Sequence, residues 1–339
     1  MLTNTKHPYK KIYFLCMITM IILLNGCVKK DQNLSKKFSS NSTIISMTVT
    51  HSNKQNDSFQ SDIILLDTKD NSTETITSVP YTSQYPLTYY SSKNNTVYYT
   101  ACANDGHGDE VFSYNCNTKK TQQLTKNFFA INNLFVTKNG LFVNAVLHGN
   151  NEVVHPFFYD FKTKEITDLL EDDDFYVRSA GKNDDSSQIL IAGHSNKVKN
   201  AIFDKGDIIG IDNYIYQYNL QSFNCTKILK KEHCYIDNVT KEKDTLIYRI
   251  RNQIFHPTYT TYIKNLKTGT ERTINITNNE KIGDFVGLSN SELYYITTNY
   301  IGEDSSSNLC KINTNTGEES VIYQTQLKRA INNAQFVTW

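Results

Sequence analysis

The 339-residue chain is poor in residues that mark several large protein classes. It has one tryptophan and five prolines, and its 35 basic and 34 acidic side chains leave a formal net charge of +1. Without a basic excess the chain lacks the charge that nucleic-acid binding requires, so nucleic acid is not an expected partner. Aromatic residues are abundant instead: 22 tyrosines and 17 phenylalanines supply bulky material for a core.

Cysteine is scarce as well. The chain has seven, and those beyond residue 27 are Cys102, Cys116, Cys225, Cys234 and Cys310. An odd number, lying in or beside predicted strands, argues against a dense disulfide framework. We expect buried free thiols, with a bridge between Cys225 and Cys234 as the alternative.

A long hydrophobic run is also missing. The apolar stretch 12–24 has about thirteen residues, whereas a transmembrane helix needs about twenty. Lys6, Lys10 and Lys11 precede it, and no acid does. A short apolar run behind positive charge is typical of a cleaved export signal.

The next four residues, Leu24-Asn25-Gly26-Cys27, resemble the lipobox of bacterial lipoproteins. The resemblance implies cleavage before Cys27 and lipid, palmitate included, on that residue. Several acyl chains anchor a protein where one alone binds only marginally. We therefore expect a signal peptide at 1–26, a lipidated flexible tether at 27–42, and a domain at 43–339 on the extracytoplasmic face of the cell membrane.

The domain shows a repeated hairpin. Six segments combine a strand, an Asp or Asn, a short polar turn and a second strand. Their acid or amide residues are Asp67, Asn115, Asp160, Asn219, Asn265 and Asn313. They recur about every 45 to 48 residues, with one interval of about 59 caused by an insertion at 193–212, and this period is typical of a four-stranded propeller blade. The sequence predicts an all-β fold, a six-bladed β-propeller; two β-sandwich domains are the alternative.

The two ends of the domain complement each other. Only one strand-like run, 43–51, precedes the first hairpin, whereas later hairpins follow two such runs. The C-terminal segment 330–338 echoes 130–137, since both begin Ala-Ile-Asn-Asn. We expect the C-terminal strand to complete the first blade and so pair two otherwise open edges.

One repeat carries a family signature. The stretch 103–115, Ala-Asn-Asp-Gly-His-Gly-Asp-Glu-Val-Phe-Ser-Tyr-Asn, resembles the TolB-type propeller repeat, in which an Asp-Gly turn leads into an acid, two apolar residues and a strand. Gly permits the positive φ of such a turn and Asp caps it. The resemblance covers the propeller architecture and implies a lipid-anchored propeller, but it carries over no function.

Three other propeller families do not fit. Sialidases need repeated Ser-x-Asp-x-Gly-x-Thr-Trp boxes and clustered arginines, whereas this chain has one tryptophan and five arginines spread from Arg178 to Arg329. Prolyl-peptidase-like enzymes need a separate hydrolase domain, for which no chain is left. Receptor propellers carry Tyr-Trp-Thr-Asp repeats, which are absent.

Candidate ligand residues gather in loops expected on one face of the propeller, around its channel. They are Asp105, His107, Asp109, Glu171, Asp172, Asp173 and Asp174. Their carboxylates could supply oxygen ligands for Ca²⁺, although clustered acids are usually just solvated. His107 is a weaker candidate for a zinc ligand or a general base.

Other residues are expected in ordinary roles. His148, His155, His194, His233 and His256 are interpreted as loop or strand-end residues, and Glu110 and Glu152 share the same loops. The tyrosine pairs 89–90, 98–99 and 294–295 could stack on sugars or peptides, but we expect one ring of each pair in the core and the other at an edge.

The leading functional hypothesis is a non-catalytic binding or sensing module for a protein, peptide or glycan. It would use the acidic face and the insertion 195–212. The first alternative is a metal-dependent hydrolase or lyase at the channel mouth, and the second is a structural or accessory envelope lipoprotein.

Overall fold

A computed structural model describes residues 42–53, 58–103, 105–149, 153–170, 174–182, 187–204, 210–253, 257–301 and 304–337. The chain divides into two units, 1–39 and 40–339, and every described residue belongs to the second. Within that part, no helix is long and apolar enough to cross a membrane. The predicted signal peptide and Cys27 lie outside the described residues.

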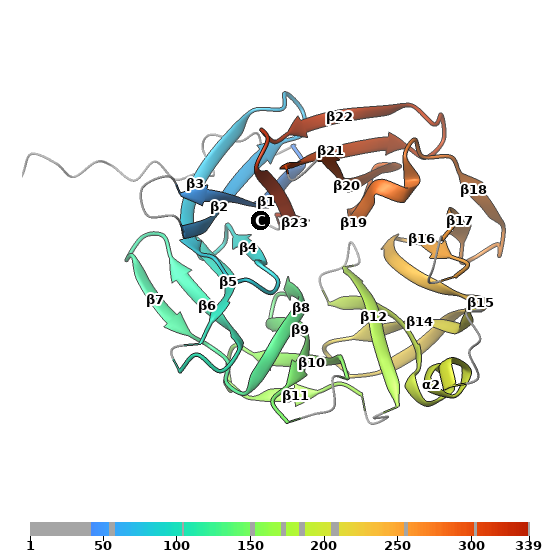
Figure 1. Cartoon of the computed structure of the whole chain (residues 1–339), viewed down its shortest axis with the longest axis horizontal. Helices are drawn as coiled ribbons and strands as arrows, with labels where there is room; N and C mark the ends of the chain where they lie inside the picture. Colours follow the sequence, from blue (N-terminus) through green and yellow to red (C-terminus); the bar gives the residue numbers. More distant parts are fainter. Residues whose placement is uncertain are drawn as a thin grey trace, which may run out of the picture. The chain divides into compact units, whose positions relative to one another are not determined.

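The second unit is built almost entirely of antiparallel strands, arranged as sheets around a centre (Figure 1). One four-stranded sheet contains β23 (Arg329–Phe336), β1 (Ile44–Asn53), β2 (Ser58–Asp67) and β3 (Thr73–Pro80). Three more contain β4 (Thr88–Ser91), β5 (Thr96–Cys102), β6 (Asp109–Asn115) and β7 (Lys120–Gln123); β8 (Phe128–Val136), β9 (Gly140–Leu147), β10 (His155–Asp160) and β11 (Ile166–Asp168); and β19 (Ile282–Ser289), β20 (Glu292–Ile301), β21 (Asp304–Asn313) and β22 (Glu319–Gln324).

The remaining sheet has seven strands, so the prediction of six separate four-stranded blades is not met. It contains β12 (Phe175–Lys182), β13 (Gln188–Ser195), β14 (Ile211–Asn219), β15 (Cys225–Glu242), β16 (Thr245–Arg251), β17 (Tyr259–Asn265) and β18 (Glu271–Ile274). The physical reason is β15, which pairs with β14 along its first half and with β16 along its second. The discrete four-stranded blades therefore number four.

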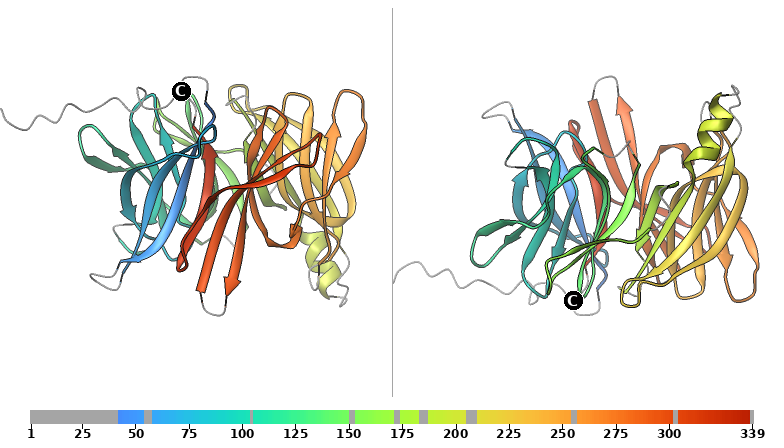
Figure 2. Two further views of the ribbon diagram at one scale, coloured as in Figure 1. Left: turned by 90° about the horizontal axis from the view of Figure 1, so that it is seen from above. Right: turned by 90° about the horizontal axis from the view of Figure 1, so that it is seen from below.

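The predicted closure of the ring is found. β23, at the end of the chain, pairs antiparallel with β1, at the start of the domain, from Ile45 opposite Phe336 to His51 opposite Arg329. The two side views in Figure 2 show the sheets standing side by side around the centre. Pairing with β23 on one side and β2 on the other leaves β1 without an open edge, and β23 becomes the innermost strand of the sheet.

The six predicted hairpins are all present, and their repeated Asp or Asn has a local cause. The side-chain oxygen of each of these residues accepts a hydrogen bond from the backbone N–H two positions later, at 2.6–3.0 Å. Four residues after each anchor, the backbone has positive φ; these residues are Asn71, Lys119, Lys164, Phe223, Gly269 and Gly317. Asp and Asn recur because their side chains stabilise this turn.

The core lies between neighbouring sheets. Four hydrophobic clusters each combine residues of two neighbouring sheets, and a fifth lies within the seven-stranded sheet, between strands on either side of the middle of β15. The expectation that one tyrosine of each pair lies at an edge is wrong: Tyr89, Tyr90, Tyr98, Tyr99, Tyr294 and Tyr295 are all buried. Successive side chains point to opposite faces of a strand, and both faces of these sheets are covered by neighbours.

Candidate binding site at the channel mouth

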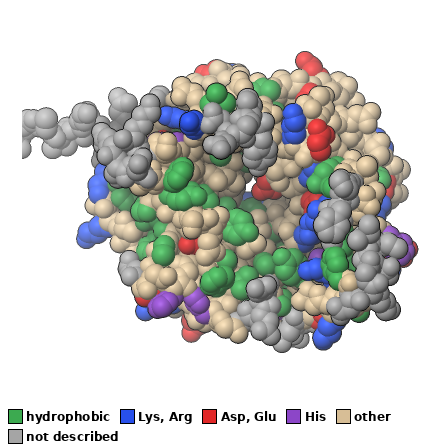
Figure 3. Space-filling model, viewed as in Figure 1, with side chains coloured by type: hydrophobic (Ala, Val, Ile, Leu, Met, Phe, Trp, Pro, Cys, Tyr) green, Lys and Arg blue, Asp and Glu red, His purple; other side chains and the backbone are tan. Residues whose placement is uncertain are grey.

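Because neighbouring strands are antiparallel, their connections alternate between two faces of the domain. The six Asp/Asn turns lie on one face, and the connections β1–β2, β3–β4, β5–β6, β7–β8, β9–β10, β13–β14 and their equivalents lie on the other, here called the loop face. The predicted insertion forms α2 (Asn196–Asp204) on the loop face. Figure 3 views this face, where hydrophobic side chains gather beside a central hollow.

The TolB-like turn forms as predicted. Asp105 accepts a hydrogen bond from the His107 backbone N–H at 3.1 Å, and Gly106 has φ +75°. Gly108 is required by close packing, since a Cβ there would lie 2.5 Å from the Phe128 carbonyl oxygen. Asp105 and His107 are both exposed, and both lie in the β5–β6 connection on the loop face.

The two acids after this turn are buried. Both carboxylate oxygens of Asp109 accept from the Thr82 hydroxyl at 2.7 Å, and those of Glu110 accept from the Thr125 hydroxyl at 2.6 Å and the Phe128 N–H at 2.9 Å. Burial raises the pKa of both carboxyl groups. Thr82 lies in the β3–β4 connection and Thr125 in the β7–β8 connection, so these acids fasten the loops on either side of their sheet.

Asp174 has a local role. Its side chain accepts from the Ser195 hydroxyl at 2.5 Å and from the Lys197 N–H at 2.7 Å, just where α2 begins. Glu171, Asp172 and Asp173 lie outside the described residues, as do Glu152 and His256. No three His, Cys, Asp or Glu side chains of the described part lie close enough to hold a metal. Ca²⁺ binding stays a prediction.

The other candidate residues have ordinary surroundings, with one exception. His148 is exposed and meets Phe129 edge-on, and His155 is buried 3.3 Å from Asp168. His194 is fully buried, and neither ring nitrogen has a hydrogen-bond partner among the described residues. It packs between Tyr176 and Tyr235, and burial, together with the positive charge of Arg178, lowers its pKa to about 3.

All five described cysteines are free thiols, but only Cys116, Cys234 and Cys310 are buried as expected, whereas Cys102 and Cys225 are exposed. Cys225 and Cys234 lie nine positions apart on β15. Nine residues of strand span about 30 Å, far more than the 4.4–6.8 Å that a disulfide allows between Cα atoms. The bridge considered from the sequence is therefore excluded by the strand itself.

A cavity of about 430 Å³ lies at the centre of the ring. Its volume falls within the range of ligand sites. The lining comes from the innermost strands β8, β12, β15, β19 and β23, with additions from β20 and β21. It comprises Asn133, Arg178, Ser179, Asp237, Asn238, Gly283, Asp284, Ile296, Thr298, Ser305, Ala330, Ile331 and Asn332. Amides, hydroxyls and charged groups outnumber apolar side chains there.

Repeated β-bulges aim side chains into this cavity. In each of five innermost strands a residue at a corresponding position is left out of the pairing register; these residues are Asn132, Arg178, Asp237, Gly283 and Asn332, and β8 and β19 each have a second such residue, Phe129 and Val286. Of the first five, all but Asn132 line the cavity. A bulge re-aims a side chain that regular pairing would hold against the neighbouring sheet, and bulges recur beside functional sites. The bulges recur at a common position in five strands, which indicates that the fold itself positions the residues that line the channel.

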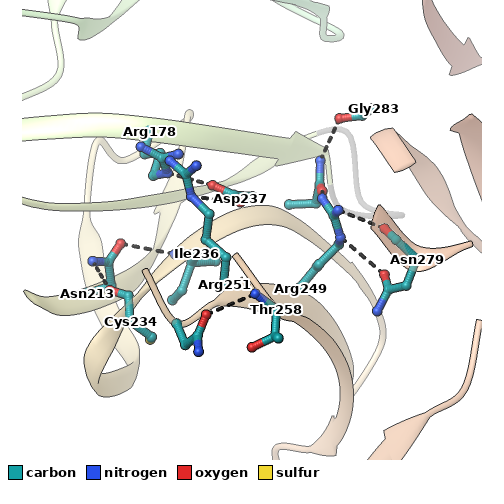
Figure 4. Close-up of polar contacts among 12 residues, drawn as sticks. Arg178, Asn213, Cys234, Ile236, Asp237, Arg249, Arg251, Thr258, Asn279 and Gly283 are labelled. Atoms are coloured by element: carbon teal, nitrogen blue, oxygen red, sulfur yellow. Dashed lines mark hydrogen bonds and ion pairs between the residues drawn. The ribbon is translucent and has the colours of Figure 1, made fainter. Parts of the chain in front are cut away.

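Three of the five arginines cluster at this channel: Arg178 from β12, and Arg249 and Arg251 from β16 (Figure 4). Arg178 donates to Asp237 at 2.6 Å, and the Arg251 Nε lies 3.3 Å from the other oxygen of the same carboxylate. Both guanidinium groups stand over the Tyr235 ring, at 5.2 and 5.4 Å from its centroid. Arginines that are spread along the sequence thus lie close together in the structure. The Ser-x-Asp-x-Gly-x-Thr-Trp boxes of sialidases are absent from the sequence.

The third arginine is joined to the cavity through Asn238. Buried Arg249 stacks 3.8 Å from the Tyr259 ring centroid and donates to the carbonyl and side-chain oxygens of Asn279, in the short helix η2 (Asn279–Lys281). It also donates to the Asn238 side-chain oxygen at 3.2 Å. The Asn238 amide donates in turn to the Asp284 carboxylate at 3.2 Å and to the Gly283 carbonyl at 3.3 Å.

Sequence reasoning missed this cluster but had a signal for it. Each bulge residue follows an aliphatic residue and precedes a polar one: Ile-Asn-Asn at 131–133, Val-Arg-Ser at 177–179, Ile-Asp-Asn at 236–238, Ile-Gly-Asp at 282–284 and Ile-Asn-Asn at 331–333. In the sequence alone, only the two Asn-Asn pairs stand out, because they repeat between 130–137 and 330–338. That the middle residues of four of these triplets, Arg178, Asp237, Gly283 and Asn332, line the cavity depends on the bulge.

Comparison with solved structures supports the fold. TolB from Acinetobacter baumannii superposes with a TM-score of 0.54 at 14% identity, over 85% of this chain and 66% of the TolB chain. A candidate TolB from Agrobacterium tumefaciens gives 0.54 at 7%, over 88% and 99%. A chain of a nidogen/laminin complex gives 0.55 at 8%, over 88% and 98%. This chain spans about two thirds of the Acinetobacter TolB.

These neighbours define the class of protein: the chain is an all-β propeller whose structural neighbours include TolB-type propellers. At such low identity the likeness shows the fold alone. No family model and no curated protein sequence matches the chain.

Proposed function

We propose that this protein is a non-catalytic binding module that holds a protein or peptide partner on its loop face, over the channel mouth. The observation that carries the proposal is the polar central cavity, which is lined by five bulged strands; three of the bulges place their own side chains there, those of Arg178, Asp237 and Asn332. Specific polar groups at the bottom of a site orient a ligand, while apolar groups around it provide contact area.

The loop face supplies such apolar groups. Phe59, Tyr85, Phe129, Val198 and Leu327 each expose about half of their surface, and each lies at or next to a connection of this face. Exposed aromatic residues are enriched at protein interfaces. One structural neighbour is a chain of a nidogen/laminin complex, and a chain of similar fold in a protein complex agrees with this use of the fold.

We further propose that the seven-stranded sheet comprises two blades that share β15, so that the ring has six blades. The two halves of β15 belong to pairing sets β12–β15 and β15–β18, each the size of one blade. One hydrophobic cluster, containing Leu190, Ile215, Val239 and Tyr248, packs between these two sets as the others pack between separate sheets.

Photocrosslinking tests the binding proposal with a matched pair of positions. Phe129 on the loop face is 51% exposed, and Phe223 on the opposite face is 49% exposed. Benzoylphenylalanine is placed at either position in cells that make the protein. We expect a defined adduct from position 129 and none from 223, and mass spectrometry identifies the peptide, or the carbohydrate if the partner is a glycan.

The cavity's contribution is tested by filling it. A Cβ on Gly283 would meet only the Ile296 carbonyl oxygen at 3.9 Å, so Gly283→Leu adds a side chain to the cavity without a clash at Cβ. It should lower the adduct at position 129 at least fivefold, whereas Gln221→Leu, exposed on the opposite face, should not. Equal adducts from both faces, or an adduct indifferent to Gly283→Leu, would contradict the proposal.

The membrane anchor is proposed from the sequence. Lipid on Cys27 would display the propeller at the extracytoplasmic face of the cell membrane, whose partners the loop face could then reach. Cys27→Ser should abolish metabolic labelling with a palmitate analogue and release the protein from the membrane fraction. Cys16→Ser, within the apolar run, is the control and should keep the label. A labelled Cys27→Ser variant would refute the anchor.

A further inference from the structure

Two carboxylates line the cavity, and their surroundings differ. Asp237 is held between Arg178 and Arg251, so its charge is compensated. Asp284 has no basic side chain within ion-pair distance among the described residues. The Phe285 N–H and the Asn238 amide both donate to the same oxygen, Oδ1, at 2.8 and 3.2 Å. Its other oxygen, Oδ2, has no partner in the described part of the chain.

The environment of Asp284 makes its negative charge costly. Burial raises its pKa to about 6, and the hydrogen bonds from Phe285 and Asn238 offset the effect only in part. An ionised carboxylate in a desolvated site is normally paired with a cation. A cation that pairs with Oδ2 would therefore come from outside the described residues.

Space for that charge lies next to Asp284. At the equivalent bulge positions of the other strands, asparagine, arginine or aspartate side chains occupy the channel, whereas β19 has Gly283. A Cβ there would be 3.9 Å from its nearest contact, so neither the backbone conformation nor close packing requires glycine. The missing side chain leaves the part of the cavity beside Asp284 open.

From the cavity, the uncompensated carboxylate and the open bulge, we infer that the channel receives an organic cation, a primary ammonium or a guanidinium group, which binds Asp284. Such a group comes either from a free amine or from a lysine or arginine of the partner. The inference deepens the proposed function, because a basic side chain entering the channel would be the polar anchor of a segment lying on the apolar loop face.

Calorimetry on the full purified chain tests the inference with defined probes. The first is the blocked tripeptide acetyl-Ala-Lys-Ala-amide, and its control replaces lysine with norleucine, which has the same stem without the charge. We expect the lysine peptide to bind at least tenfold more tightly. Lowering the pH from 7.5 to 5 should weaken it about tenfold, as Asp284 takes up a proton.

Variants assign the effect to the carboxylate. Asp284→Asn should reduce the affinity for the lysine peptide to that for the norleucine peptide, and Asp284→Glu should retain the preference. Gly283→Leu should weaken the lysine peptide by filling the space. An unchanged melting temperature, or a higher one, shows that a variant is folded. Equal affinity for the two peptides, or undiminished lysine binding by folded Asp284→Asn, would overturn the inference.

A further arm separates the two sources of the cation. If n-butylamine binds as tightly as the lysine peptide, the ligand is a free amine; tighter peptide binding indicates a side chain of a partner. Failure here is distinguishable from failure of the proposed function. If a partner is crosslinked but the lysine peptide binds no more tightly than the norleucine peptide, only the cation inference is contradicted. If the amine binds but no adduct forms on the loop face, only the proposal of a macromolecular partner is contradicted.

Discussion

Single residues of this propeller show how the same chemical group takes different roles in different surroundings. Asp109 and Asp284 are both carboxylates of β-strands, yet the Thr82 hydroxyl bonds both oxygens of Asp109, whereas within the described residues only one oxygen of Asp284 is bonded. Asp174 is a partly exposed acid whose side chain accepts hydrogen bonds from Ser195 and Lys197 at the start of α2. A carboxylate that only stabilises the fold has both oxygens bonded, whereas a candidate ligand-binding carboxylate keeps one oxygen without a partner among the described residues.

The raised pKa of Asp284 predicts the effect of Asp284→Asn on stability. The pKa is about 6 in the folded chain and 3.8 ordinarily, so the ionised form destabilises the fold above pH 6, and this cost disappears below pH 3.8. The variant should gain about 1 to 3 kcal/mol in the free energy of unfolding at pH 8 and nothing at pH 3.5. Urea denaturation at the two pH values measures this, and the exposed Asp105→Asn should show no such difference.

His194 predicts the opposite pH dependence. Its pKa is about 3 in the folded chain and 6.5 ordinarily, so between these values the unfolded chain binds the proton and the folded chain does not. Stability contributed by neutral His194 is therefore lost as the pH falls below 6.5, by up to about 1.4 kcal/mol per unit. Wild-type protein should lose more stability than His194→Leu between pH 6.5 and 4.5.

The control for His194 is His107→Leu, which replaces an exposed histidine on the loop face. Chemical denaturation at half-unit pH intervals resolves the slopes. If wild type and His194→Leu lose stability in parallel, the buried ring is not the acid-sensitive group.

At the scale of elements, the repeating unit is an Asp/Asn turn on one face and a bulge near the other. The turn stabilises the hairpin through backbone bonds to the anchor side chain, and it ends in a left-handed residue. The bulge redirects one side chain into the channel. Because the turn and the bulge lie at opposite ends of the strands, the turn is kept in every repeat while the residue at the bulge varies among the repeats.

The left-handed turn position predicts a pair of opposite stability changes. Lys164 and Gly269 occupy equivalent turn positions with φ +64° and +77°. A side chain in this region clashes with the following carbonyl oxygen, which glycine avoids. Lys164→Gly should raise the free energy of unfolding by about 0.5 to 1 kcal/mol, and Gly269→Lys should lower it by about 1 kcal/mol. Urea titrations with unchanged m-values check both changes; a destabilised Lys164→Gly would disprove the turn argument.

At the scale of the whole molecule, stability depends on closing the ring. β23 pairs with β1, and Ile331 packs in a cluster with Ile45, Met47 and Leu309 from two neighbouring sheets. The Asn333 side chain bonds Thr48 and the backbone of Thr88, joining β23 to β1 and β4. The last strand of the chain thus contacts sheets on both sides of the closure.

Weakening the closure should cost more than a matched change at the rim. Ile331→Ala should lower the free energy of unfolding by about 2 to 4 kcal/mol, since it leaves a cavity in the cluster between sheets. Val321→Ala in β22, where the side chain is 56% exposed, should cost under about 0.5 kcal/mol. Comparable losses in the two variants, measured by thermal and urea unfolding, would show that the closure contributes no special stability.

The sequence by itself determined the local features: the six hairpins, the C-terminal strand that closes the first sheet, and the tight turn at Asp105-Gly106. Each depends on neighbours in sequence or on repeat spacing, which a single chain displays. It also predicts the lipid anchor on Cys27. Only the tertiary structure decided that β15 runs through two blade-sized sets, that Asp109 and Glu110 are buried, and that Arg178, Arg249 and Arg251 meet at one channel. These outcomes depend on the closing of a ring, which brings residues from distant repeats together and buries both faces of each sheet.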